Sequence, residues 1–315
     1  MTYVNFRIWN DHSKMRVLPV KLSRYLMKLP GASIKGQAPS PATRVILQMP
    51  PGCKISDLWR VPPNAASEKQ LKEWEGIDNN LHSFLAKSIP EALQHTGSAA
   101  FDEHLLGVQA VLRHWGAHEA ISKAGLFHSI YGTEGFQGFK LPFTYRSRIR
   151  ELIGERSERL VWRFCVVDRF TVDQLVAQHL QASMEGRDLR EQFKCLARAE
   201  LGRFEVEFKD SEEWLDFVVL VLADWLEQVE GAAEKCNMLY GWGVGEAWMY
   251  RREAYRNMAQ LLALHRTPEG PLAQAMHAQV YAVEPQSTRR LHQPITPPMS
   301  DAAKEAQQAL ASVHE

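Results

Sequence analysis

Between Ser67 and Leu264 the apolar residues recur at helical spacing almost throughout the chain. Apolar residues three or four positions apart lie on one face of an α-helix, whereas a half-buried strand needs them at every second position. Strand-like alternation is nearly absent from this region. The chain has 315 residues, 45% of them hydrophobic, which is enough for a sizeable core. The sequence therefore predicts an all-α body over residues 67–264.

Helical spacing marks ten segments of this body: 67–75, 78–96, 100–115, 117–130, 144–153, 155–167, 171–182, 187–200, 211–230 and 246–264. The flanking parts differ in composition. Residues 1–66 contain Pro and Gly at the density of turns, so we predict an irregular arm with RVILQM as its one candidate strand. Residues 265–315 are predicted to form a loose tail, whose Ala- and Gln-rich end allows a terminal helix.

Charge is unevenly distributed, although 37 Lys and Arg balance 37 Asp and Glu. Up to Arg60 there are ten basic and two acidic residues, so the acidic excess lies in the rest of the chain. We expect the basic arm to dock on the acidic body, with attraction of an anionic ligand as the alternative. A nucleic-acid partner is not expected, because the sequence of the body indicates no basic surface.

The cysteine and hydropathy patterns predict a cytoplasmic protein. The cysteines are widely scattered and form no CxxC pair, so free thiols in a reducing compartment are expected. No run reaches the roughly 18 apolar residues of a membrane span, so no membrane partner is expected. The start, MTYVNFRIWNDHSK, lacks the apolar segment of a secretory signal.

Two histidines stand on the apolar faces of neighbouring predicted helices. His104 lies four residues before Val108, and His128 lies four residues after Ala124, so each imidazole points inward with the apolar side chains. Gly116 separates the two helices, and so short a turn makes them antiparallel neighbours. The two imidazoles can therefore approach to the distance at which they would share a metal ion.

A carboxylate comes from a third predicted helix, DSEEWLDFVVLVLADWLEQVEG. This segment is apolar around most of its circumference, so Asp224 within it is predicted to be buried. A buried carboxylate needs a cation, a metal ion or a hydrogen-bond donor. With His104 and His128 it forms a candidate site for a divalent metal ion. Taken singly, each residue has an alternative role, as a core histidine or as a capping or Arg-paired aspartate.

The pattern of these residues resembles the HD superfamily of metal-dependent hydrolases. His104 and His128 are 24 positions apart, Ser129 follows, and LADWLEQ comes much later. Within the superfamily this looks most like the hydrolase domain of the stringent-response guanosine-polyphosphate enzymes. IRELIGERSERLVWRF also resembles the segment after their HD dipeptide, and the similarity runs from about Phe101 to Leu264. The stretch HSIYGTEGF looks like that of an uncharacterised HD-like family.

The resemblance implies an HD-like helical bundle with a divalent ion, Mn, Fe, Zn or Ni, held by His104, His128 and Asp224. It also implies an Asp directly after the second histidine, where this chain has Ser129. One carboxylate ligand is therefore lost, because a neutral hydroxyl is a poor substitute. Glu134 lies in a Gly-flanked loop and is the candidate to replace it and orient the attacking water.

Four residues are candidates for binding a small anionic substrate. Arg146 and Arg150 are four positions apart, share a helix face and suit a phosphate or carboxylate. Lys123 and Tyr131 flank the second histidine closely enough to line the site entrance. The alternatives are a solvated helix face with Glu pairs for the arginines, an exposed lysine and a tyrosine that fills a pocket.

Three functions are compatible with these features. The first is a metal-dependent hydrolase of a phosphate ester or nucleotide. The second is a non-catalytic HD-like module that binds a ligand or partner, which the loss of the HD aspartate favours. The third is a di-iron oxygenase of the kind represented by myo-inositol oxygenase. Such enzymes use two further histidines, and between His128 and Asp224 this chain has only His179.

Overall fold

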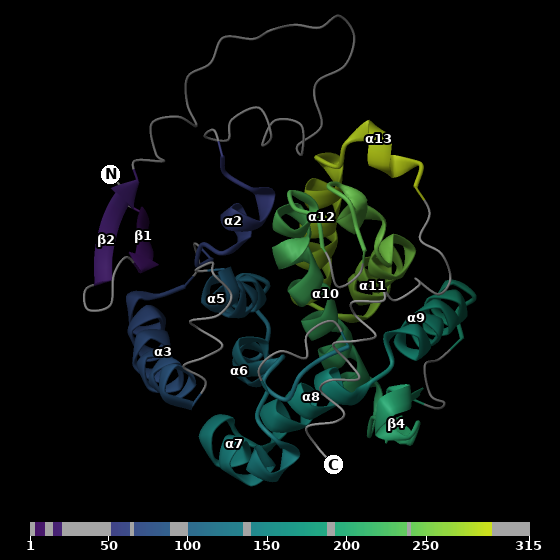
Figure 1. Cartoon of the computed structure of the whole chain (residues 1–315), viewed down its shortest axis with the longest axis horizontal. Helices are drawn as coiled ribbons and strands as arrows, with labels where there is room; N and C mark the ends of the chain where they lie inside the picture. Colours follow the sequence, from purple (N-terminus) through teal and green to yellow (C-terminus); the bar gives the residue numbers. More distant parts are fainter. Residues whose placement is uncertain are drawn as a thin grey trace, which may run out of the picture. The chain divides into compact units, whose positions relative to one another are not determined.

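The computed structural model describes residues 4–9, 15–20, 52–63, 66–88, 100–134, 140–187, 193–237 and 241–291. The chain divides into two units, Met1–Cys53 and Lys54–Glu315. In the first unit, strands β1 (Val4–Trp9) and β2 (Met15–Val20) pair in antiparallel register. The second unit contains the helical body (Figure 1).

The prediction of an irregular arm over residues 1–66 is wrong for its described parts. They hold the β1–β2 pair and a short helix, α2 (Ile55–Trp59). In β1, Val4, Phe6 and Ile8 alternate with their neighbours at the period of a strand, and pairing satisfies backbone groups that an irregular segment would leave open. The predicted strand RVILQM lies outside the described residues, as do most of the basic residues expected to dock on the body.

The fold is mostly α-helical, as predicted. The helices after α2 are α3 (Glu68–Ser88), α5 (Ala100–His114), α6 (Glu119–Phe127), α7 (Arg146–Ile153), α8 (Glu155–Val166), α9 (Arg169–Met184), α10 (Ser211–Ala233), α11 (Arg252–His265), α12 (Glu269–Ala282) and α13 (Gln286–Arg289). Short 3-10 helices cover Phe143–Tyr145, Ala199–Leu201 and Glu246–Met249. Within the described ranges no helix is both long enough and apolar enough to span a membrane.

The predicted helix 187–200 is wrong where the structure describes it. Residues Lys194–Leu196 form strand β3, which pairs with strand β4 (Glu205–Glu207). Between them the chain turns at Gly202, whose φ of 93° is a conformation that glycine adopts readily. The directly paired residues Cys195 and Val206 are both buried, which anchors this hairpin to the body.

The body also extends beyond both predicted ends. Helix α2 packs against α5, α10 and α12, and α12 packs against α10 and α11. Ala273, Met276 and Val280 of α12 are fully buried at helical spacing. Residues 265–291, predicted as part of a loose tail, therefore belong to the body. The predicted terminal helix near the end of the chain lies outside the described residues.

Helix α10 lies at the centre of the body and contacts α2, α5, α6, α8, α11 and α12 (Figure 1). Every residue from Trp214 to Ala223 is buried, as its apolar sequence predicts. Asp210 begins the helix by accepting a hydrogen bond from the backbone N–H of Glu213 at 2.9 Å. A polar side chain on this helix is therefore held in place by packing on several sides.

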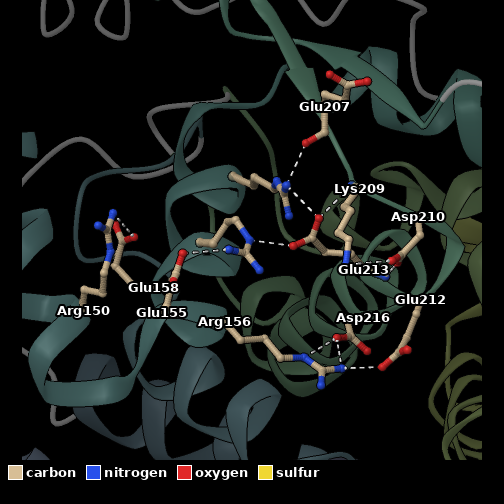
Figure 2. Close-up of polar contacts among 12 residues, drawn as sticks. Arg150, Glu155, Arg156, Glu158, Glu207, Lys209, Asp210, Glu212, Glu213 and Asp216 are labelled. Atoms are coloured by element: carbon tan, nitrogen blue, oxygen red, sulfur yellow. Dashed lines mark hydrogen bonds and ion pairs between the residues drawn. The ribbon is translucent and has the colours of Figure 1, made fainter.

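Ion pairs join α8 to α10 (Figure 2). Arg156 contacts the fully buried Asp216 at 2.5 Å, and Arg159 and Arg163 contact Glu213 at 2.6 and 2.9 Å. Burial works to raise the pKa of Glu213, but Arg163, the backbone N–H of Lys209 and Arg159 outweigh it and lower the pKa to about 2. The charged form of Glu213 therefore stabilises the fold.

We expect Glu213→Gln to lower the free energy of unfolding by about 3 kcal/mol at neutral pH, given a pKa that falls from 4.5 to about 2 on folding. Because folding lowers this pKa, the contribution is complete above pH 4.5 and is lost as the pH falls through 2. Urea unfolding of both proteins across this range measures the difference. A difference that stays constant down to pH 2 contradicts the assignment.

Candidate metal centre

Three side chains from three helices converge as the sequence predicts. His104 of α5, His128 at the end of α6 and Asp224 of α10 each offer a ligand atom, and these atoms lie within 4.8 Å of one another. Nε2 of His104 is 3.1 Å and Nε2 of His128 is 3.3 Å from the same Oδ1 of Asp224. In the part of the chain that the structure describes, no other three His, Cys, Asp or Glu residues are grouped in this way.

The hairpin of α5 and α6 brings the two histidines together. Gly116 forms the turn with a φ of 76°. Gly125 lets α6 approach α5 closely, because a Cβ atom there would lie 2.5 Å from a methyl carbon of Leu112. The two imidazole rings are perpendicular, with centroids 5.1 Å apart. The short turn and the missing side chain thus fix how closely the imidazoles approach.

Hydrogen bonds set the orientation of both imidazoles. Nδ1 of His128 lies 2.7 Å from the carbonyl oxygen of Gly125, and Nδ1 of His104 contacts a carboxylate oxygen of Glu227. Both partners can only accept, so each Nδ1 carries the proton. In a neutral imidazole this leaves the lone pair on Nε2, and both Nε2 atoms face the Oδ1 atom of Asp224, so either a proton or a metal ion can lie between nitrogen and oxygen. Histidine ligands of metal ions have this arrangement.

Glu227 is a component of the site that the sequence analysis missed. Its side chain is 1% exposed and also pairs with Arg60, the residue that ends α2. A Cβ atom at Gly107 of α5 would collide with the Glu227 carboxylate, so only glycine leaves it room. Glu227 follows Asp224 by three residues, which places both on one face of α10, and this spacing is the signal that could have found it.

Opposite charges dominate the electrostatics of the cluster. Burial disfavours the charged form of His104, but Glu227 and Asp224 outweigh it and raise the pKa of His104 to about 10. Burial likewise opposes ionisation of Asp224, yet His128 and His104 hold its pKa well below the usual range. A proton on His104 and a divalent ion would compete for the same nitrogen. Two imidazoles and one ionised carboxylate fit a borderline divalent ion.

Ser129 is buried, and its hydroxyl has no hydrogen-bond partner within the described ranges. Such a group is unusual in a folded protein and calls for an explanation. Its position next to His128 is where the HD resemblance implies a carboxylate ligand. A serine hydroxyl is neutral, so this position supplies no negative charge to the cluster.

Glu134 does not join the cluster, which corrects its predicted role in orienting water. Its Oε2 accepts the backbone N–H of Arg169 at 2.9 Å. That N–H belongs to the first turn of α9, where backbone donors lack partners within the helix. The carboxylate is therefore used to begin a helix. The sequence could not show this, because the partner lies 35 residues away.

The predicted substrate residues surround a different carboxylate. Arg146, Arg150 and Tyr131 contact the fully buried Glu158 at 2.6, 3.5 and 3.2 Å, and Figure 2 shows Arg150 beside it. The positive charges of Arg146 and Arg150 balance the buried charge of Glu158. The role of these residues in substrate binding stays a prediction. Lys123 of α6 is half-buried and has no polar partner among the described side chains.

His179 lies apart from the cluster. Its ring is buried against Phe193 and Trp214, with centroids 5.1 and 5.7 Å away. The second iron of an oxygenase would need further histidines beside the first site. The described residues place none there besides His104 and His128.

Comparison with known proteins gives one partial match. A family model described as a domain of unknown function, DUF6817, matches residues 84–169. This part includes both histidines of the cluster, while Asp224 lies beyond it. No curated protein and no solved structure matches the chain.

Proposed function

We propose that the protein is a metal-dependent hydrolase of phosphate esters or nucleotides. The observation that carries the proposal is the meeting of two histidine Nε2 atoms at one carboxylate oxygen of Asp224, at 3.1 and 3.3 Å. Metal ligands are usually preorganised by outer partners, and here both Nδ1 atoms are already hydrogen bonded.

Each residue of the cluster has a definite role in this proposal. His104, His128 and Asp224 hold the ion, while Glu227 and the Gly125 carbonyl keep the imidazoles in the orientation that presents Nε2. When bound, a divalent ion polarises a phosphoryl group and makes water a stronger nucleophile near neutral pH.

Hydrolysis assays test the proposal directly. Wild-type protein loaded with Mn²⁺, Fe²⁺, Zn²⁺ or Ni²⁺ is incubated with p-nitrophenyl phosphate, bis-p-nitrophenyl phosphate and the nucleoside 5′-phosphates. We expect metal-dependent phosphate release that His128→Gln abolishes. His265→Gln is the control, because His265 is exposed at the end of α11 and contacts Ser183. Bound metal without hydrolysis of any of these esters contradicts the hydrolase.

A non-catalytic metal-binding module is the second candidate function. Ser129 supplies no carboxylate, and Glu134 caps α9, so the described cluster has no spare carboxylate to orient water. If this candidate is right, the protein binds the ion stoichiometrically and hydrolyses none of the substrates.

We also propose that the protein works in the cytoplasm. Its four cysteines are all free: Cys53 and Cys236 are exposed, and Cys165 and Cys195 are buried. Free thiols on the surface suit a reducing compartment, where glutathione keeps them unpaired.

The substitution Ser129→Asp is expected to strengthen Mn²⁺ binding by ~1–3 kcal/mol, because it restores a negative ligand beside His128. It should also destabilise the metal-free protein, since an unpaired buried carboxylate is unfavourable. Thermal melts with and without Mn²⁺ measure both effects. Ser122→Asp is a matched control, because Ser122 is also buried with an unpartnered hydroxyl. Equal metal-induced shifts in wild type and Ser129→Asp contradict the expectation.

A further inference from the structure

Arg169, the first residue of α9, is buried and has no carboxylate partner among the described residues. Its exposed fraction is 7%. Five arginines are buried in the described ranges, and the other four form ion pairs: Arg113 with Asp78 and Glu119, Arg163 with Glu213, Arg198 with Glu200, and Arg251 with Asp173. The Arg169 guanidinium instead lies over the ring of Phe164, 4.0 Å from its centroid. A buried charge of this kind needs an anion.

The acidic side chains that contact the start of α9 are already engaged. Glu134 accepts the backbone N–H of Arg169, not its guanidinium. Asp168 accepts backbone N–H groups of the first turn of α9 and pairs with Arg203 at 2.7 Å. These carboxylates bind backbone N–H groups and Arg203, so neither neutralises the Arg169 guanidinium, and no other described carboxylate pairs with it.

Arg169 lies close to the metal-binding cluster. The Phe164 ring that it covers packs edge-on against the His128 ring, with centroids 5.0 Å apart. The thiol of the neighbouring Cys165 donates to the His128 carbonyl oxygen at 3.1 Å. One aromatic ring therefore separates the guanidinium from a ligand of the proposed metal ion.

A buried tyrosine hydroxyl also links the two. Burial raises the pKa of Tyr255 well above its ordinary value, Arg251 and Arg169 oppose the rise, and Asp224 adds to it. The charges of Arg169 and Asp224 thus act on the same hydroxyl. That hydroxyl is held by Arg251 at 3.0 Å.

We propose that Arg169 is the anion-binding residue of this site and holds a phosphate group of the ligand. A guanidinium matches phosphate with two parallel hydrogen bonds, and the attraction is strong where water is excluded. The inference rests on the proposed function for the class of ligand, because a hydrolase of phosphate esters needs a cation to hold its substrate.

Titration with inorganic phosphate tests the inference. Binding to metal-free protein is measured by calorimetry at constant ionic strength, for wild type, Arg169→Met, Arg169→Lys and Arg198→Met. Arg169→Met keeps the apolar stem and removes the charge. We expect its dissociation constant to rise roughly tenfold to a hundredfold, with a smaller rise for Arg169→Lys. Arg198→Met should bind like wild type, because Arg198 is a buried arginine already paired with Glu200. Equal affinities of wild type and Arg169→Met overturn the inference.

Hydrogen exchange of the wild-type protein gives an answer that does not depend on how the variants fold. Phosphate should slow exchange in the first turn of α9, at Phe170–Val172, and leave α12 unchanged. Unchanged exchange at these residues overturns the inference.

The anion-binding inference and the proposed hydrolase can fail separately. If the protein binds phosphate through Arg169 but binds no metal, the inference is supported and the hydrolase is overturned. Metal binding without phosphate binding overturns the inference alone.

Discussion

Asp224→Asn is expected to lower the affinity for Mn²⁺ roughly a hundredfold or more, because it removes the one charged ligand of the cluster. Asparagine has nearly the same shape, and it leaves both histidines in place. Their Nε2 atoms would then face a neutral amide where the Oδ1 atom of Asp224 now lies at 3.1 and 3.3 Å. The loss therefore reports the charge of the ligand and not the packing of α10.

Thermal or chemical unfolding with and without Mn²⁺ measures this loss. A ligand that binds only the folded state adds about 2.7 kcal/mol at 100 times its dissociation constant, and about 0.4 kcal/mol when the two are equal. Asp216→Asn is the matched control, because it removes another buried carboxylate from α10 that contacts Arg156 and Arg266. This control should lower the free energy of unfolding but keep the increase in that free energy on addition of Mn²⁺. A full metal-induced gain in Asp224→Asn contradicts the assignment.

Glu227→Gln is expected to lower the free energy of unfolding by about 3 kcal/mol, because it removes the buried negative charge that pairs with Arg60 and with Nδ1 of His104. The same change should weaken metal binding by roughly tenfold to a hundredfold, as is usual when an outer partner of a ligand is lost. Gly107→Ala offers an independent route to the same effect, since its Cβ would displace the Glu227 carboxylate.

Glu230→Gln separates the effect on stability from the effect on metal affinity. Glu230 lies one turn after Glu227 on α10 and accepts the backbone N–H groups of Ile55 and Ser56, both at 2.9 Å. It therefore also holds α2 on the body but does not contact a histidine. Its substitution should reduce stability without changing metal affinity. If Glu230→Gln weakens metal binding as much as Glu227→Gln, the role of Glu227 in orienting His104 is wrong.

The sequence predicts the site because its three residues obey local rules. His104 and His128 each lie four residues from an apolar position, and a one-glycine turn makes their helices neighbours. Asp224 is placed by the apolar character of α10. Each of these inferences needs only the few residues around it, and the structure confirms their convergence within 4.8 Å.

The surroundings of the site depend on contacts between distant segments. Arg60 reaches Glu227 across 167 positions, from a short helix in a part of the chain that composition marks as irregular. Glu134 accepts a backbone N–H at the start of α9, and Arg146 forms an ion pair with Glu158. In each case the residue type suits substrate binding or catalysis, and only the three-dimensional partner shows the role it has. The hairpin β3–β4 was missed for the same reason, because pairing with a separate segment decides its conformation.

The metal content of the protein, purified without added metal or chelator, tests the central claim most directly. Elemental analysis should find about one equivalent of manganese, iron, zinc or nickel in the wild type, as a single site with three protein ligands holds. The same preparation of His128→Ala should contain none. A wild-type protein that carries no metal and gains none on addition of Mn²⁺ contradicts the account, and His104, His128 and Asp224 then form an ion-paired core cluster only.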